Sequence, residues 1–214
     1  MSTIRRAAFL SVSNDNAMKK IFFSLSVFMA LASSACSSGM DPDIKQNPHP
    51  MMRYDVTITV ENAPGPFDSV SGFMQYQVAD IDCVPETGGP MNAMRIPPTV
   101  NPAIVFNKIA DNVYRGTVYA DYFQDENYYG LGVCHWSLMA VIAELRINNL
   151  TLDPGLTADE LFSQKSLKSY FVLEDYLDNS RQRSSYGVFS RPNFPPDRQK
   201  EIFTITLTTK EIAP

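Results

Sequence analysis

Alternation of apolar and polar side chains gives the clearest structural signals in this chain. In the segment 54–60, YDVTITV, valine and isoleucine alternate with threonine, which is the period-two pattern of a half-buried strand. The same reasoning, with turn-forming residues between the segments, predicts strands over 70–78, 103–109, 113–120, 132–147, 169–173 and 202–208. We expect 103–109 and 113–120 to pair as a hairpin. The segment 132–147 should be one long strand, or a strand bent by a bulge. A helix is the less favoured alternative, because AVIAEL at 140–145 is compatible with one.

One short helix is predicted after Thr157. Thr157 and Glu160 have the spacing of a capping box, and Leu161 and Phe162 follow as the first apolar pair. Seven or eight short strands with one short helix predict a mainly all-β fold, an antiparallel β-sandwich formed by a single domain over 53–214. The sequence contains no internal repeat and no Rossmann, P-loop or GxSxG motif.

The first 35 residues have the features of a secretory signal peptide. Lys19 and Lys20 precede the apolar stretch 21–31, IFFSLSVFMAL, and small residues lead from there to Cys36. This stretch is much shorter than the ~20 apolar residues that a transmembrane helix needs. Because Met18 stands directly before the two lysines, we expect translation to start there. A longer basic region from residue 1 is the alternative, with the same mature protein.

The residues before Cys36 resemble a bacterial lipobox. Ser34 and Ala35 are small, as is usual at such a cleavage point, whereas Ser33 stands where an aliphatic residue is common. The resemblance implies that Cys36 becomes the acylated first residue, and several acyl chains would anchor it stably. Ser37 is similar to an outer-membrane sorting signal, which implies a lipid-anchored protein on the periplasmic side of that membrane. Ordinary cleavage after Ala35, which releases a soluble periplasmic protein, is the alternative.

The region 36–52 is predicted to be a flexible tether between the lipid and the domain, because it holds three prolines and no periodic pattern. The formal charge of the chain is −5; removal of residues 1–35 takes away four basic side chains and one acidic side chain, which makes it −8. Such a charge argues against nucleic acid as a partner. Of the two histidines, His49 lies in the tether and His135 in the domain. We therefore expect no metal site and no cofactor.

Cys83 and Cys134 remain once Cys36 is assigned to the lipid. Two cysteines in an oxidising compartment indicate one disulfide. The bridge would join positions 51 residues apart, which the chain-entropy account rates at ~4 kcal/mol of stabilisation. Two buried free thiols are the alternative, whereas a metal pair is disfavoured because no CxxC spacing is present.

The segment 121–136, DYFQDENYYGLGVCHW, is the most distinctive candidate site. In one interpretation it is a loop whose tyrosines provide rigid contact area and whose carboxylates attract a basic protein partner. In a second it binds calcium, although the EF-hand spacing is absent. In a third it is a structural turn whose aromatic rings cover the edge of the sandwich beside the disulfide. The candidate partner contacts are Tyr122, Asp125, Glu126, Tyr128 and Tyr129.

His135 and its neighbours allow one further interpretation. A hydrolase that used His135 would need a nucleophile and an orienting acid nearby, and no motif marks either one. Trp136 is expected to pack against the disulfide, as tryptophans in sandwiches do. A second acidic and aromatic run, 170–178, is interpreted as a solvated loop after its first strand residues.

Three features together resemble a group of small lipoproteins of Gram-negative bacteria that are encoded beside type VI secretion lipase effectors. They are the lipoprotein start, the segment YFQDENYYG with the following CHW, and VTITVENAPGPF at 56–67. Members of this group look like immunity proteins. The resemblance implies that the mature chain blocks a secreted lipase-type effector in the periplasm and needs no catalytic residue. The alternative is a structural or accessory lipoprotein of a cell-envelope complex.

Overall fold

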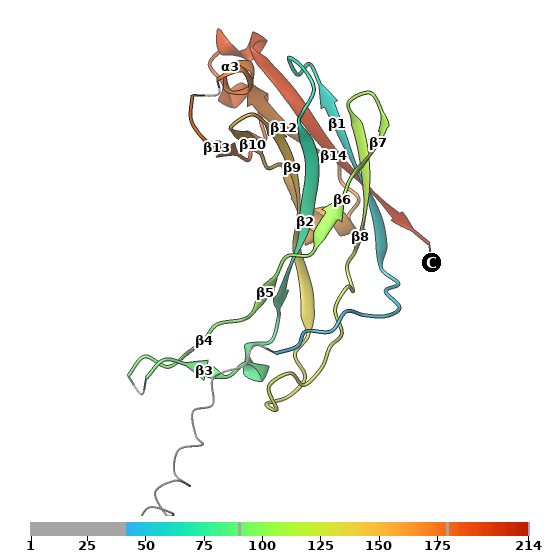
Figure 1. The fold of residues 1–214 in the computed structure, drawn as a ribbon, viewed down its shortest axis with the longest axis vertical. Helices are drawn as coiled ribbons and strands as arrows, with labels where there is room; N and C mark the ends of the chain where they lie inside the picture. Colours follow the sequence, from blue (N-terminus) through green and yellow to red (C-terminus); the bar gives the residue numbers. More distant parts are fainter. Residues whose placement is uncertain (1–41, 90, 179, 214) are drawn as a thin grey trace, which may run out of the picture. The chain divides into compact units, whose positions relative to one another are not determined.

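The computed structural model in Figure 1 describes residues 42–89, 91–178 and 180–213. The predicted signal peptide, the start at Met18 and the lipidated Cys36 lie outside the described residues. From Pro42 onwards the described chain forms one compact unit. Within these ranges no helix has the length and apolar character needed to cross a membrane.

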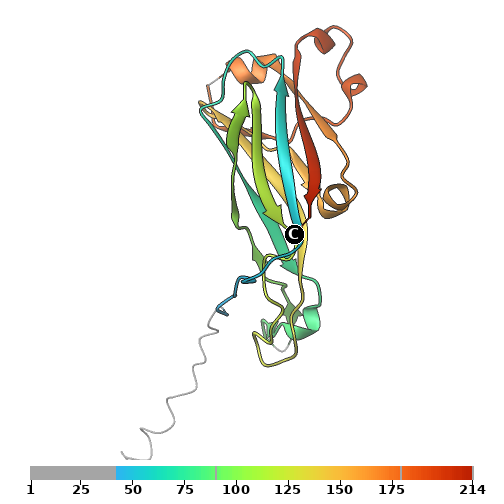
Figure 2. The same cartoon turned by 90° about the vertical axis from the view of Figure 1, so that its right-hand side faces the viewer.

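Two β-sheets packed against each other make up this unit (Figures 1 and 2), which confirms the predicted all-β, sandwich-like fold class. The five-stranded sheet has the order β12 (Leu167–Val172), β14 (Ile202–Ile212), β1 (Arg53–Glu61), β8 (Val113–Tyr119) and β7 (Asn107–Ala110). The seven-stranded sheet has the order β13 (Arg183–Ser185), β10 (Leu150–Leu152), β9 (Trp136–Ile147), β2 (Ser69–Val78) and β5 (Thr99–Val100), with β11 (Gly155–Thr157) on β9 and β6 (Ala103–Val105) on β2.

Short elements complete the fold. The strands β3 (Glu86–Thr87) and β4 (Met94–Arg95) pair with each other, apart from the two sheets. The helical turns are η1 (Ile81–Cys83), α2 (Ala158–Phe162), α3 (Leu173–Leu177), η2 (Arg191–Asn193) and η3 (Arg198–Lys200). The predicted capping box is present at α2: the Thr157 amide donates to the Glu160 carboxylate at 2.8 Å, and the Glu160 amide donates to the Thr157 hydroxyl.

The core lies between the two sheets and follows the period-two pattern of the sequence. In β1 the side chains of Val56 and Ile58 are fully buried, and β14 contributes Ile205 and Leu207 in the same way. Ile58 lies opposite Leu207 in the antiparallel register. Burial of such aliphatic side chains supplies the main stabilising free energy of a sandwich, at ~1.5–3 kcal/mol for each.

The predicted bulge is present in β9. In the pairing with β2, Gln75 lies opposite Ala140 but Tyr76 lies opposite Leu138, so Met139 is the extra residue. Successive side chains of a strand point to opposite faces of the sheet. One extra residue therefore shifts this alternation by one position in the part of the strand that follows it. As a result Leu138 and Val141 both point into the core although they are three residues apart.

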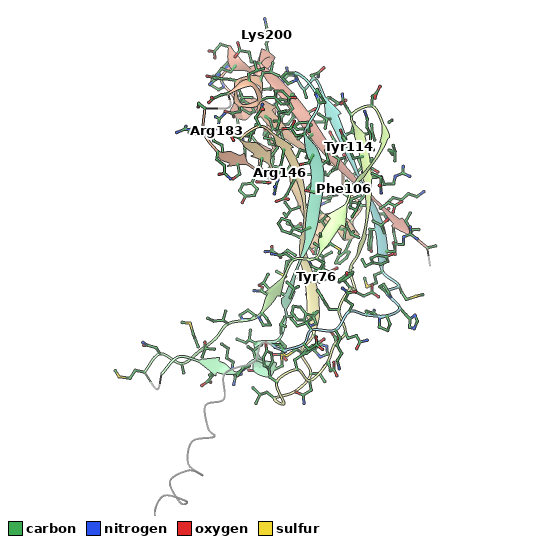
Figure 3. All side chains as sticks on the ribbon, in the orientation of Figure 1. Tyr76, Phe106, Tyr114, Arg146, Arg183 and Lys200 are labelled. Atoms are coloured by element: carbon green, nitrogen blue, oxygen red, sulfur yellow. A yellow bond between two sulfur atoms is a disulfide. The ribbon has the colours of Figure 1, made fainter. Side chains whose placement is uncertain are left out.

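Two expectations from the sequence are corrected by the structure. The segment 103–109 is not one strand of a hairpin: β6 pairs with β2, and only β7 pairs with β8. The chain passes from one sheet to the other at the buried Phe106, labelled in Figure 3. Ile104 and Phe106 are buried on the way to this crossing, whereas all four residues of β7 after it are exposed. The run 170–178 is also not a loop, because α3 forms over Leu173–Leu177 and buries Tyr176.

Candidate functional site

The predicted disulfide is present between Cys83 and Cys134, with Cα atoms 5.3 Å apart. It fastens η1 to the loop that precedes β9. Both cysteines are buried in a small apolar cluster of their own, and the ring of Trp136 packs against this cluster as expected from the sequence. The disulfide therefore holds the base of the loop 121–136 in place.

Asp121 at the start of this loop is bonded to the predicted tether. Its carboxylate accepts hydrogen bonds from the amides of Met51 and Met52 at 2.8 and 3.0 Å, and its carbonyl accepts one from the Asn47 side chain at 2.9 Å. Within the predicted tether 36–52, the residues from Lys45 onwards are therefore bonded to this loop. A proline-rich segment without a pattern can still satisfy its backbone groups against another loop, and nothing in its own sequence shows this.

Both carboxylates among the predicted partner contacts have partners within the chain. Asp125 accepts a hydrogen bond from the Trp136 amide at 2.9 Å, and its other oxygen lies 2.7 Å from Nδ1 of His135. Glu126 forms an ion pair of 2.7 Å with Lys45, and this pairing raises the pKa of the Lys45 ammonium above its usual range. Both acids therefore stabilise the loop, and both side chains remain partly exposed.

The three predicted tyrosines are half-buried and pack inwards. The ring of Tyr122 stacks on the buried Tyr76 with centroids 6.2 Å apart. Tyr128 meets Trp136 edge-on, and Tyr129 packs against the disulfide cluster. The structure thus brings all five predicted contacts together on one loop. This arrangement agrees with the interpretation as a structural turn whose aromatic rings cover the sandwich edge.

The tip of the loop is the part that faces solvent. Leu131 and Val133 are 54% and 48% exposed, and Gly130 next to them has a left-handed φ of 74°. The His135 ring is also exposed beside Asp125. This pair supplies the orienting acid that a histidine-based hydrolase needs, and such a hydrolase would also need a nucleophile. No group of three His, Cys, Asp or Glu side chains in the described ranges is arranged to hold a metal ion.

A second candidate site lies on the outer face of the seven-stranded sheet, and the sequence interpretation missed it. Two adjoining hollows of about 640 and 370 Å³ share Ile142, Asp153 and Tyr186, and we call them together the acidic groove. The larger hollow is also lined by Ala140, Gly155, Leu156, Thr157, Glu160, Leu167 and Phe189. The smaller hollow is also lined by Phe73, Gln75 and Glu144.

The floor of the acidic groove is formed by the outward side chains of β9. Ala140, Ile142 and Glu144 are half-buried and line the hollows, while Val141 and Ala143 between them are buried in the core. The run 138–143, LMAVIA, is therefore apolar on both faces of the strand. This continuous apolar run is the signal in the sequence for a strand with apolar side chains on both faces.

One wall of the acidic groove is the segment 185–189. Tyr186 and Phe189 line the larger hollow and are 66% and 62% exposed. Val188 holds the segment in place through two backbone hydrogen bonds with Tyr170 of β12, at 2.8 and 3.0 Å. Gly187, the residue before Val188, has a φ of 75°, and a Cβ at this position would lie 2.7 Å from the ring of Phe171. The wall is thus a built feature of the fold.

The charge of the groove comes mainly from carboxylates. Burial raises the pKa of the Asp153 carboxyl, and the nearby Glu144 raises it further, whereas Arg146 (labelled in Figure 3) lowers it. Glu144 accepts hydrogen bonds from the Ser71 hydroxyl at 3.3 Å and from Arg146 at 3.2 Å. Glu160 is occupied by the cap of α2. One arginine therefore faces the two acids Glu144 and Asp153.

Comparison of the chain with models of protein families, with curated proteins and with solved structures finds no match. The candidate sites therefore have to be interpreted from their own chemistry.

Proposed function

We propose that the mature chain is a periplasm-facing, lipid-anchored immunity protein that binds and neutralises a lipase-type antibacterial toxin. The binding part of this proposal is carried by the acidic groove, where Tyr186 and Phe189 stand largely exposed beside an apolar floor. Exposed aromatic side chains around an apolar patch are typical of a surface that a protein partner covers. An inhibitor needs such a surface and no catalytic group.

The compartment is supported by the disulfide between Cys83 and Cys134. Disulfides persist in the periplasm and are rare in the reducing cytosol. The lipobox-like residues before Cys36 add the anchor, which would hold the inhibitor at the membrane that a lipase attacks.

The loop 121–136 is proposed as a second contact surface. Its tip presents Leu131 and Val133, and Asp125 and Glu126 beside it are partly exposed. Because the disulfide and the hydrogen bonds of Asp125 hold the loop, little conformational entropy would be lost when a partner binds it.

A protection assay tests the proposal. Cells export the product of the neighbouring gene, which under this proposal is a lipase-type effector, into the periplasm with and without the full chain. We expect survival only with the full chain, and loss of protection when the signal region 1–35 is deleted. The variant Cys36→Ala lacks the cysteine that would be acylated, so the protection it gives shows whether inhibition needs the lipid anchor. Immunoblots must show equal amounts of each variant.

Killing at full expression of the chain would overturn the proposal. An affinity capture of the lipidated protein from the envelope then addresses the alternative. Recovery of a stable envelope complex, with no effector in it, would favour a structural or accessory lipoprotein.

A further inference from the structure

We infer that the acidic groove receives an extended segment of a protein partner, one that inserts an arginine or lysine side chain together with apolar side chains. This inference names the chemistry of the partner in the proposed function, and it rests on that function only for the identity of the partner as a toxin. The steps below use the lining, the charge and the size of the groove.

The lining requires an occupant that is partly apolar. The floor consists of Ala140 and Ile142 from β9 with Leu156 from β11, and Phe73 of β2 lies opposite Ile142 in the sheet register. Water at such a surface gains few hydrogen bonds, so apolar side chains that displace it gain the hydrophobic free energy. A purely polar or purely ionic occupant would leave this floor unused.

The charge of the groove selects a cation. Asp153 and Glu144 line the smaller hollow together, and the cation beside them is Arg146, itself exposed. The Glu144 carboxylate also accepts a hydrogen bond from the Ser71 hydroxyl. A guanidinium or ammonium group that enters the hollow would therefore reach the Asp153 carboxylate in a partly desolvated place, where the attraction between opposite charges is stronger than in water.

The aromatic rings favour the same chemistry. Tyr186 and Phe73 line the hollow that also holds Asp153 and Glu144. A cation next to a ring face gains a further attraction from the ring quadrupole, and arginine makes this contact most often. A carboxylate and aromatic rings around one hollow thus match an arginine or lysine side chain better than a neutral one.

The dimensions indicate an extended segment as the occupant. The two hollows of about 640 and 370 Å³ meet at Ile142, Asp153 and Tyr186, so one ligand has to pass this point to fill both. An extended chain does so, because its alternate side chains point the same way and can enter successive hollows. A second copy of this acidic chain would bring like charges together, and a phosphate group would be repelled by the same carboxylates.

The test uses the full-length protein in its disulfide-bonded form and three peptides. The probe is acetyl-Ala-Leu-Arg-Leu-Ala-amide, and the matched peptides carry citrulline or glutamate in place of the arginine. Binding is followed by NMR chemical-shift changes. We expect shifts at Ile142, Asp153 and Tyr186 with the arginine peptide, at least fivefold weaker binding of the citrulline peptide, and none of the glutamate peptide.

Variants of the groove sharpen the test. Asp153→Asn and Glu144→Gln should each weaken the binding of the arginine peptide at least threefold. The binding of the citrulline peptide should stay unchanged. Tyr186→Ala should weaken both peptides. The control is Asp111→Asn, which removes a fully exposed carboxylate in the turn between β7 and β8 and should have no effect. Thermal melts show whether each variant is folded.

Equal binding of the arginine and citrulline peptides would overturn the inference, and so would equal effects of the Asp153 and Asp111 variants. A dimer in sedimentation velocity that Tyr186→Ala dissolves would also overturn it, in favour of a second copy. If the wild type protects cells and Asp153→Asn protects equally, the groove does not hold the toxin and the proposed function stands. If the peptide binds as expected but the wild type gives no protection, the proposed function fails and the groove chemistry stands.

Discussion

An oxygen of the Asp125 carboxylate lies 2.7 Å from Nδ1 of His135, across the loop that the disulfide anchors. The second oxygen accepts a hydrogen bond of 2.9 Å from the Trp136 amide. The Asp125 side chain therefore fastens the middle of the loop to the start of β9. The contact between the Asp125 carboxylate and the His135 ring is partly exposed and contributes little by itself. The hydrogen bond from the amide to a charged acceptor contributes more, because it satisfies a backbone group.

Removal of the Asp125 side chain should therefore loosen the loop. We expect Asp125→Ala to lower the free energy of unfolding by about 1–2 kcal/mol, and Asp125→Asn by less, because the amide oxygen can still accept from Trp136. Urea denaturation measures the change, and hydrogen exchange of the Trp136 amide should become faster in the alanine variant. Asp111→Ala is the matched control at an exposed turn. Equal stability of the Asp125 and Asp111 variants would show that the bond contributes nothing.

The disulfide should be the strongest single constraint on the fold. Cys83 and Cys134 are 51 residues apart, so the double variant Cys83→Ala with Cys134→Ala should lose about 4 kcal/mol of stability through the gain in entropy of the unfolded chain. Urea denaturation with and without reductant measures the loss. Reductant should destabilise the wild type and leave the double variant unchanged. Two thiols that react with an alkylating agent before reduction would contradict the bridge.

The sheets could be predicted from the sequence wherever a strand is long. The alternation in β1 and β14 identifies the inward side chains, Ile58 and Leu207 among them, because each strand has one face in the core. The strands β10, β11 and β13 have three residues each, which is too few for any pattern. The alternation of buried side chains ends at Phe106, because all four residues of β7 are exposed, and the sequence does not show that β6 and β7 pair with different strands.

The candidate sites could likewise be predicted from the sequence only in part. The sequence identifies the loop 121–136 by its composition, but not that Tyr129 faces the disulfide or that Glu126 faces Lys45, since these partners come from other segments. The acidic groove joins β9 with a wall at 185–189, which begins 38 positions after the end of β9. The parallel pairing of β13 with β10 and the bridge between Val188 and Tyr170 of β12 hold that wall beside the sheet.

Two glycines with the same backbone conformation separate conformational strain from steric contact. Gly187 and Gly130 have φ values of 75° and 74°, but a Cβ at Gly187 would meet the ring of Phe171 at 2.7 Å whereas Gly130 has open space around it. Gly130→Ala should cost about 1 kcal/mol, the price of a left-handed alanine. Gly187→Ala should cost about 2–4 kcal/mol, because the buried Phe171 must also shift.

Denaturation curves of the two glycine variants test this difference. If both lose the same stability, the wall of the groove is not packed against Phe171 as the structure has it. A larger loss at Gly130 would place the rigid segment in the loop 121–136 instead.

Ionisation of the Asp153 carboxyl should lower the stability of the fold. Its pKa is raised in the folded state by burial and by Glu144, so the folded chain binds this proton more tightly than the unfolded chain does. The stability that the bound proton contributes is complete below the unfolded pKa of ~3.9 and is lost as the pH rises through the folded value. Asp153→Asn, which cannot ionise, should therefore melt about 1–3 °C above the wild type at pH 7 and equally with it near pH 3. Thermal melts between pH 3 and pH 8 measure this difference, with Asp111→Asn as the control that stays parallel to the wild type. A lower melting temperature of Asp153→Asn at pH 7 would mean that the carboxylate already has its cation within the chain, and the groove would then have no charge to offer an incoming arginine.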